Sequence, residues 1–381
     1  MKILLQNRYD ALTKKGGDTY QMLMTRKNLE QLGVKADIST ALAPDLSGYE
    51  LVHLFNITRV GETYRQYKNA RSKGCKIVLS PVYQSRSDVK AYEDNQLNGF
   101  MGWLLRNIPD IDKRQLLKTG YYTLNRPSLW PVWVSQFYLG YTRQQKEILA
   151  SVDHILPNSE MEMLRIKEEL FLGNASTAAY TIVLNGVEMD STEDTDRISG
   201  WLQKIKLTDY VICAGRIEPL KNQLAVMAAL KDTGLKVVFA GAVNPAHGGY
   251  AKKVLRQFRE NPNFFYLGEI GPSDLMALNK LARVSVLASW LETTGLAALE
   301  AGLAGANVVI TERGYTREYF GESVWYCDPS NISTIREAVM AALAAPRGAR
   351  QLDKRIADMK LNWLEAAKKT LMVYQQILGS N

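Results

Sequence analysis

Short apolar runs rich in valine, isoleucine and leucine alternate with longer helical stretches along nearly the whole chain, and this alternation constrains the fold more than any other feature. The runs have the length of single buried strands, and strands that alternate with helices form parallel sheets with helices on both faces. The sequence therefore predicts an α/β fold.

The predicted strands fall into two series. The first consists of Lys2–Gln6, Val34–Ser39, Leu51–Phe55, Lys76–Ser80, His154–Pro157 and Tyr180–Leu184. The turn Asn185-Gly186 ends it, and the acidic stretch Asp190–Asp196 has the composition of a linker. The second series consists of Tyr210–Ala214, Leu235–Ala240, Asn263–Leu267, Val284–Leu287 and Val308–Thr311. Ligands of doubly wound sheets bind beyond the carboxyl ends of the strands, so we expect two such domains to face each other across a cleft.

The length of 381 residues fits two domains better than one, because single cores stop growing at a smaller size. We expect one domain at residues 1–188, a second at 189–360 and a terminal helix at 361–381. No apolar run approaches the roughly 20 residues that a membrane span needs. The start Met1–Leu5 turns polar at once, which predicts a buried strand rather than a secretion signal.

The net charge indicates which classes of partner are favoured, and the cysteine content indicates the cellular compartment. The net charge of +8 favours an anionic partner such as a nucleotide sugar, a phospholipid surface or a nucleic acid. A nucleic acid is disfavoured, because the sequence has no Lys/Arg-rich run, zinc-finger spacing or helix-turn-helix signal. Cys75, Cys213 and Cys327 are widely separated and odd in number, which predicts reduced thiols in a cytoplasmic protein.

The strand predicted at Tyr210–Ala214 is followed by Gly215 and by two cations, Arg216 and Lys221, before a helix. An arginine fork and a lysine point charge at the carboxyl end of a strand suit the oxygens of a diphosphate. They can also neutralise the charge that develops on a diphosphate as it leaves. The same pair fits ordinary surface charges, and the sequence leaves both interpretations open.

A second candidate segment follows the strand predicted at Val284–Leu287. Thr293 or Thr294 is predicted to cap a helix there. The amides near Gly295 and Leu296 would then point outward as an anion site for phosphate.

Two glutamates frame this segment. Glu292 lies in the loop before the helix, and Glu300 is the one charge within residues 295–306. A lone carboxylate on an apolar helix is costly unless it has a partner. The functional interpretation is that Glu300 accepts hydrogen bonds from ribose hydroxyls while Glu292 contacts sugar hydroxyls. The alternative is a structural ion pair.

Near the N-terminus, Gly16-Gly17 links the first strand to a helix. A glycine pair there lets backbone amides approach a phosphate or a sugar, and a plain tight turn explains it equally well. No G-x-G-x-x-G follows a predicted strand, which argues against a dinucleotide-dependent dehydrogenase.

Taken together in chain order, these segments resemble glycosyltransferase family 4, the retaining, nucleotide-sugar-dependent enzymes of the GT-B architecture. The matches are Gly16-Gly17, Glu50-Leu51-Val52-His53, Leu156-Pro157-Asn158-Ser159, Val183-Leu184-Asn185-Gly186-Val187, Gly215-Arg216 with Lys221, Phe265-Tyr266-Leu267-Gly268-Glu269, Glu292 with Glu300, and Trp363. They cover most of the chain, and their joint order makes the resemblance specific where each piece alone is not.

The resemblance implies two Rossmann-like domains facing across a cleft, with the acceptor bound by the first and the donor by the second. It implies that Arg216 and Lys221 bind the diphosphate and Glu292 the donor sugar, which makes these three the catalytic candidates. It also implies that a last helix, around Trp363–Leu378, crosses back onto the first domain.

The resemblance further implies that Glu300 binds the ribose and that Leu267–Ile270 lies near the base. The remaining residues assigned to donor binding are Gly16, Gly17, Gly215, Leu267, Glu269, Ile270, Thr293, Thr294, Gly295 and Leu296. Neither a metal nor a cofactor is expected. Asp194 and Asp196 have the spacing of metal-binding aspartates in sugar transferases of another fold, but they lie in the predicted linker, and we interpret them as solvated.

One segment departs from the family pattern. Many relatives carry a histidine just after the fourth strand, whereas this chain reads Leu79-Ser80-Pro81-Val82-Tyr83-Gln84 there. Its three histidines are His53, His154 and His247. The family's reaction is thought to use the donor's own phosphate as base, so the departure leaves the acceptor-side chemistry open without excluding activity.

Aromatic and basic residues gather in one segment of the first half. The aromatics are Tyr121, Tyr122, Trp130, Trp133, Phe137, Tyr138 and Tyr141, and the basic residues are Lys113, Arg114, Lys118, Arg126, Arg143 and Lys146. This combination is typical of a peripheral contact with an anionic membrane, here at its inner face. A helical core with a solvated rim and stacking on the acceptor are the other interpretations.

The sequence thus favours a metal-independent glycosyltransferase that moves a hexose or N-acetylhexosamine from a UDP- or GDP-linked donor to a glycan, lipid-linked or small-molecule acceptor. A UDP-sugar epimerase of the same two-domain plan is the alternative enzyme. A non-catalytic nucleotide-sugar or glycan-binding relative is the alternative from another class.

Overall fold

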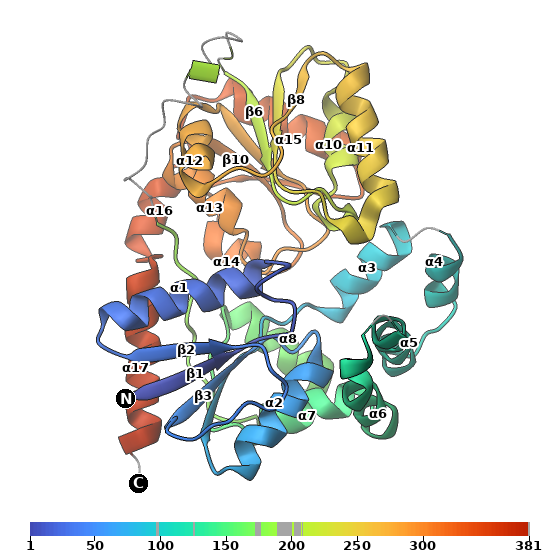
Figure 1. Ribbon diagram of the computed structural model, residues 1–381. Helices are drawn as coiled ribbons and strands as arrows, with labels where there is room; N and C mark the ends of the chain where they lie inside the picture. Colours follow the sequence, from blue (N-terminus) through green and yellow to red (C-terminus); the bar gives the residue numbers. More distant parts are fainter. Residues whose placement is uncertain are drawn as a thin grey trace. The chain divides into compact units, whose positions relative to one another are not determined.

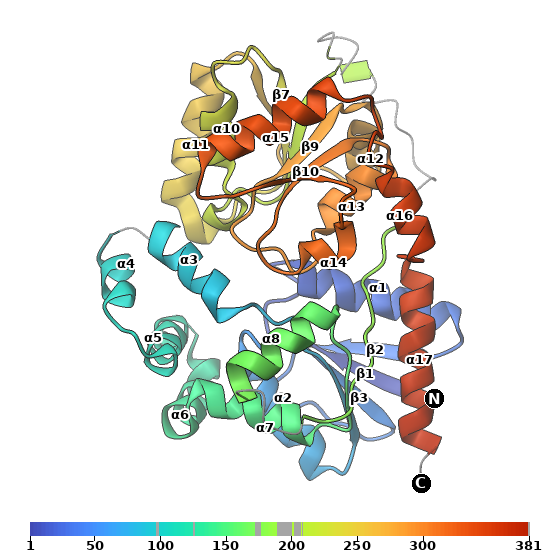
Figure 2. The same cartoon turned by 180° about the vertical axis from the view of Figure 1, so that it is seen from behind.

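The computed structural model describes residues 1–96, 99–124, 126–171, 177–188, 200–201, 207 and 209–379. The predicted linker at Asp190–Asp196, with Asp194, lies outside these residues. The chain forms two compact units, shown in Figures 1 and 2. Unit 1 comprises Met1–Arg86, Leu97–Gly186 and Asn362–Asn381, and unit 2 comprises Ser87–Gln96 and Val187–Leu361.

Unit 1 contains a five-stranded sheet of order β2-β1-β3-β4-β5, in which all neighbours run parallel. Its strands are β1 (Lys2–Gln6), β2 (Lys35–Ser39), β3 (Leu51–Phe55), β4 (Lys76–Ser80) and β5 (His154–Ile155). The chain order reverses between β1 and β3, so the switch point of this sheet lies at the carboxyl ends of these two strands.

The helices of unit 1 are α1 (Gly17–Gln31), α2 (Val60–Ser72), α4 (Gly99–Arg106), α5 (Ile111–Leu124), the 3-10 turn η1 (Pro127–Leu129), α6 (Trp130–Leu139), α7 (Tyr141–Ser151), α8 (Glu160–Phe171) and α17 (Trp363–Gly379). Helix α3 (Arg86–Gln96) belongs to unit 2 apart from its first residue. No helix in the described part of the chain combines the length and the apolar character that crossing a bilayer requires.

Alternate strand residues of unit 1 enter two separate cores. Leu4, Val52 and Leu54 pack with residues of α2, α7 and α8 on one face. Ile3 and Leu5 pack with residues of α1 and α17 on the other. Because strand side chains alternate between faces, this burial explains why helices cover both sides of the sheet.

The last helix, α17, completes unit 1. It packs against α1, and the Tyr374 hydroxyl lies 2.6 Å from Nδ1 of His53 on β3. His53 is also 3.0 Å from the Ser80 hydroxyl, and burial lowers its pKa to about 3. His53 is therefore a neutral core residue that ties the end of the chain to the centre of the first sheet.

Unit 2 contains a six-stranded parallel sheet of order β11-β10-β9-β6-β7-β8. Its strands are β6 (Val211–Ala214), β7 (Val237–Ala240), β8 (Phe264–Tyr266), β9 (Val284–Leu287), β10 (Asn307–Thr311) and β11 (Trp325–Cys327). The chain order reverses between β6 and β9, which places the second switch point at their carboxyl ends.

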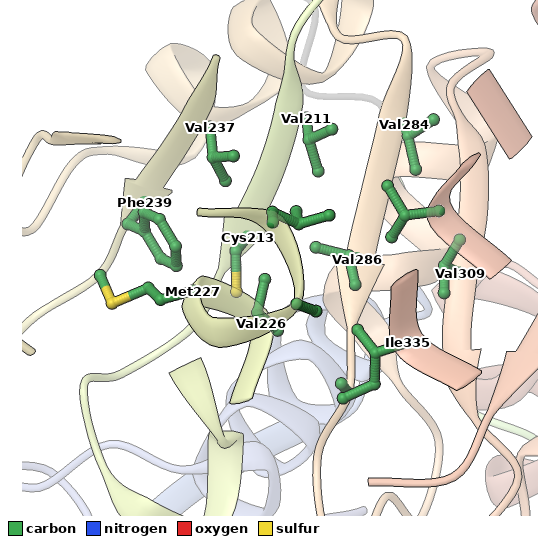
Figure 3. Packing of buried hydrophobic residues seen from close by; sticks show 14 of the residues in the cluster. Val211, Cys213, Val226, Met227, Val237, Phe239, Val284, Val286, Val309 and Ile335 are labelled. Atoms are coloured by element: carbon green, nitrogen blue, oxygen red, sulfur yellow. The ribbon is translucent and has the colours of Figure 1, made fainter. Parts of the chain in front are cut away.

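The remaining described helices of unit 2 are the 3-10 turns η2 (Pro219–Lys221) and η3 (Pro245–His247), α10 (Gln223–Leu230), α11 (Gly248–Glu260), α12 (Pro272–Leu281), α13 (Leu296–Leu303), α14 (Thr316–Phe320), α15 (Ile332–Ala344) and α16 (Leu352–Asp358). Figure 3 shows one core of the unit, in which Val211, Cys213 and Val286 of the sheet pack with Val226 of α10 and Ile335 of α15. The opposite face is filled by residues of α12.

The strands of the structure differ from the predicted strands in two places. The segment predicted as a strand at Tyr180–Leu184 forms only an isolated bridge between Ile155 and Tyr180, because its partner β5 is two residues long. Strand β11 was not predicted, since its three residues are too few to show a period. The other predicted strands are present, with ends that differ by at most two residues.

Candidate functional site

The loops that follow β6 and β9 meet at the switch point of unit 2. The Trp290 amide donates a hydrogen bond to the Leu220 carbonyl at 2.9 Å, and Lys221 Nζ lies 2.5 Å from Oε1 of Glu292. The two side chains are 21% and 10% exposed. Two of the three predicted catalytic residues are therefore in direct contact at the place where ligands of doubly wound sheets bind.

Arg216, the third, lies in the same loop as Lys221. The stem of Lys221 packs over Gly215, where an added Cβ would lie 3.6 Å from the lysine Cδ. Arg216 Nη2 donates to Oε1 of Glu218 at 3.0 Å, and Arg216 is 39% exposed. Because a guanidinium has five N–H donors and an ammonium has three, both cations keep donors for a ligand.

Glu218 was not singled out from the sequence. It is 4% exposed, and its second oxygen accepts a hydrogen bond from Nδ2 of Asn244 at 2.6 Å. From the sequence, a glutamate in a loop is expected to be a surface charge. Only the fold shows that Glu218 is buried and orients Arg216.

Backbone contacts join the carboxyl ends of β6, β7 and β8. The Gly215 amide donates to the Ala240 carbonyl at 2.8 Å, and the Gly241 amide donates to the Gly268 carbonyl at 2.7 Å. Gly241 has φ +145°, and a Cβ there would lie 2.2 Å from the Gly215 carbonyl oxygen, so only glycine fits. These contacts hold the loop that carries Leu267, Glu269 and Ile270 beside Gly215.

Helix α13 begins at Leu296 with Gly295 as its N-cap, in the left-handed region at φ +80°. The predicted threonine cap is therefore wrong: neither Thr293 nor Thr294 caps the helix. The amides of Gly295, Leu296 and Ala297 have no acceptor within the described part of the chain. Helix N-termini with free amides are suited to bind anions.

Glu300 lies on α13 with no hydrogen-bond or ion-pair partner for its carboxylate among the described residues. Burial raises its pKa to about 7. Within the described residues Glu300 forms no structural ion pair, whereas Glu292 forms one with Lys221. A partly buried carboxylate with no partner in the described part of the chain has capacity for hydrogen bonds from a ligand.

Unit 1 gathers charges at its own switch point, and sequence reasoning missed them. Arg8, just after β1, lies 2.9 Å from Asp18 through Nε and 2.7 Å from Asp10 through Nη1. Arg59, after β3, lies 2.7 Å from the same Asp10 oxygen and also pairs with Glu62. The available signal was that these residues follow two strands whose carboxyl ends are neighbours in a parallel sheet.

The predicted residues Gly16 and Gly17 border this cluster, at the start of α1. A Cβ on Gly16 would lie 2.8 Å from an Asp18 oxygen and 3.3 Å from Nη2 of Arg8, whereas nothing lies within 4 Å of one on Gly17. Burial works to raise the pKa of Asp18, but the hydrogen bonds and charge of Arg8 outweigh it and lower that pKa. Gly16 thus makes room for an ionised buried pair.

The segment where many relatives carry a histidine follows β4. Val82 there has φ +45°, a conformation that β-branched residues rarely adopt. The next amide, of Tyr83, donates to Oε1 of Glu162 at 2.5 Å, and the other oxygen of Glu162 accepts from the Asn158 amide at 2.5 Å. A buried glutamate therefore fixes the backbone of this segment.

Comparison with known families finds a match within the second unit. Residues 196–359 match the model of the family described as glycosyl transferases group 1. This match covers most of unit 2. The resemblance to glycosyltransferase family 4 is confirmed over these residues.

Curated relatives match the same part of the chain. The D-inositol 3-phosphate glycosyltransferases of Mycobacterium bovis (strain BCG / Pasteur 1173P2) and Mycobacterium tuberculosis (strain ATCC 25618 / H37Rv) are each 25% identical over 178 residues. The match covers 45% of this chain and 36% of each relative. The chain thus aligns with about a third of the length of these proteins.

Solved structures extend the similarity to the whole chain. Sucrose-phosphate synthase from Thermosynechococcus elongatus superposes with a TM-score of 0.72 at 13% identity, covering 100% of both chains. HepE of Anabaena, solved in complex with UDP-glucose, gives a TM-score of 0.66 at 14% identity, covering 99% of this chain and 100% of its own. The predicted GT-B fold is confirmed.

Proposed function

We propose that the chain is a retaining glycosyltransferase that binds a nucleoside-diphosphate sugar in unit 2. The observation that carries the proposal is the grouping of Lys221, Arg216 and the first amides of α13 around one switch point. Neither these amides nor the Glu300 carboxylate has a partner among the residues that the structure describes. Cations and amides suit a diphosphate, and a carboxylate suits sugar hydroxyls.

Catalysis follows from charge that grows during the reaction. When the bond between the sugar and the diphosphate breaks, the leaving diphosphate gains negative charge, and preorganised donors stabilise that state more than the bound donor. Arg216 and Lys221 retain free N–H donors for this purpose. Because they bring positive charge to the diphosphate, we propose that the reaction needs no metal ion.

The remaining contacts define the donor. Glu300 accepts hydrogen bonds from the two ribose hydroxyls, and Glu292, held by Lys221, contacts the sugar. HepE of Anabaena was solved with UDP and with UDP-glucose. A UDP-linked hexose is therefore the first donor to test, and a GDP-linked hexose the second.

We assign the acceptor to unit 1. Its switch point carries the carboxylates of Asp10, Asp18 and Glu62 beside Arg8 and Arg59. Carboxylates accept hydrogen bonds from hydroxyl groups, which supports a hydroxyl-rich acceptor such as a glycan or a lipid-linked sugar.

A donor screen with the full chain tests the proposal. UDP- and GDP-sugars are compared by thermal shift, because a ligand at a hundred times its dissociation constant stabilises a protein by about 2.7 kcal/mol. The stabilising donor is then followed for release of nucleoside diphosphate with and without acceptors. We expect transfer, or slow hydrolysis without an acceptor. Tight binding with neither reaction would instead indicate a non-catalytic binder, and a changed but still nucleotide-linked sugar would indicate an epimerase.

A further inference from the structure

Helix α6 of unit 1 presents an apolar face that the proposed function does not use. The helix has the sequence WPVWVSQFYL, without one charged residue. Trp130, Val134, Phe137 and Tyr138 are 49%, 40%, 58% and 78% exposed. Large exposed apolar surfaces of this kind mark sites of interaction with proteins or membranes. These four side chains are therefore not part of a helical core.

Helix α6 is packed against α5 and α2. Trp133 stacks on Phe137 with ring centroids 5.8 Å apart, and it forms a T-shaped pair with Trp130 with centroids 5.3 Å apart. A Cβ on Gly120 of α5 would lie 2.9 Å from Nε1 of Trp133, so α5 and α6 are in close contact, side by side in Figures 1 and 2. The buried side of α6, through Val132, packs on α2.

The end of α5 adds a second apolar strip. Leu117, Tyr121, Tyr122 and Leu124 are 43%, 58%, 52% and 78% exposed. We call Leu117, Tyr121 and Leu124, together with Trp130, Val134, Phe137 and Tyr138, the α5–α6 surface. Tyr122 is not part of it, because its ring lies against Arg59, 5.9 Å from the guanidinium carbon. The surface combines aromatic rings with branched aliphatic side chains on two packed helices.

The charges around this surface are mostly basic. Arg143 and Lys146 on α7 and Lys113 on α5 are exposed, and Arg126, before α6, is exposed but lies over the Tyr9 ring at 4.4 Å. The acidic residues nearby are Asp110, Asp112 and Glu147, and Glu147 forms an ion pair with Lys68, so they are fewer than the basic residues. The flanks of the surface therefore present positive charge to a partner.

These features select one occupant. We propose that the α5–α6 surface binds an anionic lipid bilayer, with α6 lying in the plane of the interface. Aromatic side chains lie at the level of the lipid headgroups, and lysine and arginine side chains attract anionic phosphates. In a dimer built on this face, each copy would meet the same face of the other, so its basic flanks would repel.

Co-sedimentation of the full chain with vesicles tests the proposal. We expect binding to phosphatidylcholine vesicles that contain phosphatidylglycerol, weaker binding to phosphatidylcholine alone, and loss of binding as salt screens the charges. Replacing Phe137 and Tyr138 together by serine should weaken binding by about tenfold or more, because two apolar side chains no longer leave water. The matched control is Leu164→Ser with Met372→Ser, which changes side chains that are 55% and 67% exposed on α8 and α17.

Two outcomes would overturn the proposal. One is equal vesicle binding by the wild-type protein and the Phe137/Tyr138 variant, provided that circular dichroism shows a folded variant. If that variant does not fold, Tyr138→Asp replaces it, since this side chain is 78% exposed. The other is absence of binding to the anionic vesicles by the wild-type protein. A concentration-dependent dimer that the variant abolishes would then assign the surface to a second copy. No sugar donor is present, so the result is independent of the proposed activity.

Discussion

The Glu300 carboxylate, which we propose binds the ribose of the nucleotide, lowers the stability of the fold when it is ionised. Folding raises the pKa of this carboxyl from its ordinary value of 4.5 to about 7, so the folded chain binds more protons than the unfolded chain between these values. The free energy of unfolding therefore falls as the pH rises through this window. We expect Glu300→Gln to be more stable than the wild type by about 1 to 3 kcal/mol near pH 8, and equally stable below about pH 4.5.

Urea unfolding at the two pH values measures this difference. Glu337→Gln on α15 is the control, because Glu337 is exposed and its replacement should leave stability unchanged. A Glu300→Gln variant that is less stable than the wild type near pH 8 would show that the carboxylate supports the fold.

The same residue predicts how nucleotide binding depends on pH. Only the ionised carboxylate accepts hydrogen bonds from both ribose hydroxyls, so the affinity for the preferred nucleotide should rise as the pH rises through about 7. Glu300→Gln should weaken binding by about 1.5 to 3 kcal/mol and remove the pH dependence. Calorimetry checks both. An unchanged dissociation constant in the folded variant would refute the ribose assignment.

At the residue scale, the sequence shows which side chains to examine but not what they contact. Arg216, Lys221 and Glu292 stand out by their place after strands, whereas the 2.5 Å contact between Lys221 and Glu292 depends on the folded loops. Whether Glu300 has a partner likewise depends on the fold, and none of the described residues pairs with it. Arg8 and Arg59 escape notice because they are 51 residues apart in sequence and meet only through Asp10.

At the element scale, the ends of β6, β7 and β8 depend on one glycine. A Cβ on Gly241 would lie 2.2 Å from the Gly215 carbonyl oxygen, so Gly241→Ala should displace the loop that holds Arg216 and weaken both stability and donor binding. Gly268→Ala is the control: its φ is +71° but nothing lies within 4 Å, so it should cost only about 1 to 2 kcal/mol of backbone strain. Thermal unfolding and donor titration of both variants check this, and equal effects would exclude the close approach as the cause.

Elements were predictable where their pattern is long and local. Buried strands such as β3 and β4 can be recognised by continuous apolar runs, since parallel strands are covered on both faces. The N-cap of α13 could not be predicted. Threonine is a common N-cap, so Thr293 and Thr294 were preferred over Gly295, which caps the helix with a left-handed backbone. The edge strand β11 is too short to show a period, and its pairing with β10 depends on tertiary structure.

At the scale of the whole molecule, chemistry without a metal gives a simple prediction. We expect excess EDTA to leave sugar transfer unchanged, because Arg216 and Lys221 supply positive charge to the diphosphate. Activity assays with and without EDTA, followed by addition of manganese, check this. Activity that is lost on chelation and restored by manganese, together with an inactive Asp196→Ala, would contradict it.

The parallel sheet of each unit could be predicted because alternation of strands and helices admits few arrangements, whereas the order of the strands was not predicted. Which unit each helix belongs to could not be predicted as easily, because it depends on contacts between residues far apart in the sequence. Helix α3 belongs to unit 2 although it lies within the first half of the sequence, and α17 belongs to unit 1 although it ends the chain. Contacts such as that between His53 and Tyr374 decide this, and they join residues 321 positions apart.

The central claim, that Lys221 and Arg216 stabilise a leaving diphosphate, is tested most directly by steady-state kinetics of Lys221→Ala with the preferred donor. Removing one preorganised donor typically lowers turnover by about 100- to 1,000-fold, and we expect a much smaller change in donor affinity. Lys231→Ala, at an exposed position after α10, should behave as the wild type. If a folded Lys221→Ala keeps more than about a third of wild-type turnover, far short of that loss, the claim is contradicted.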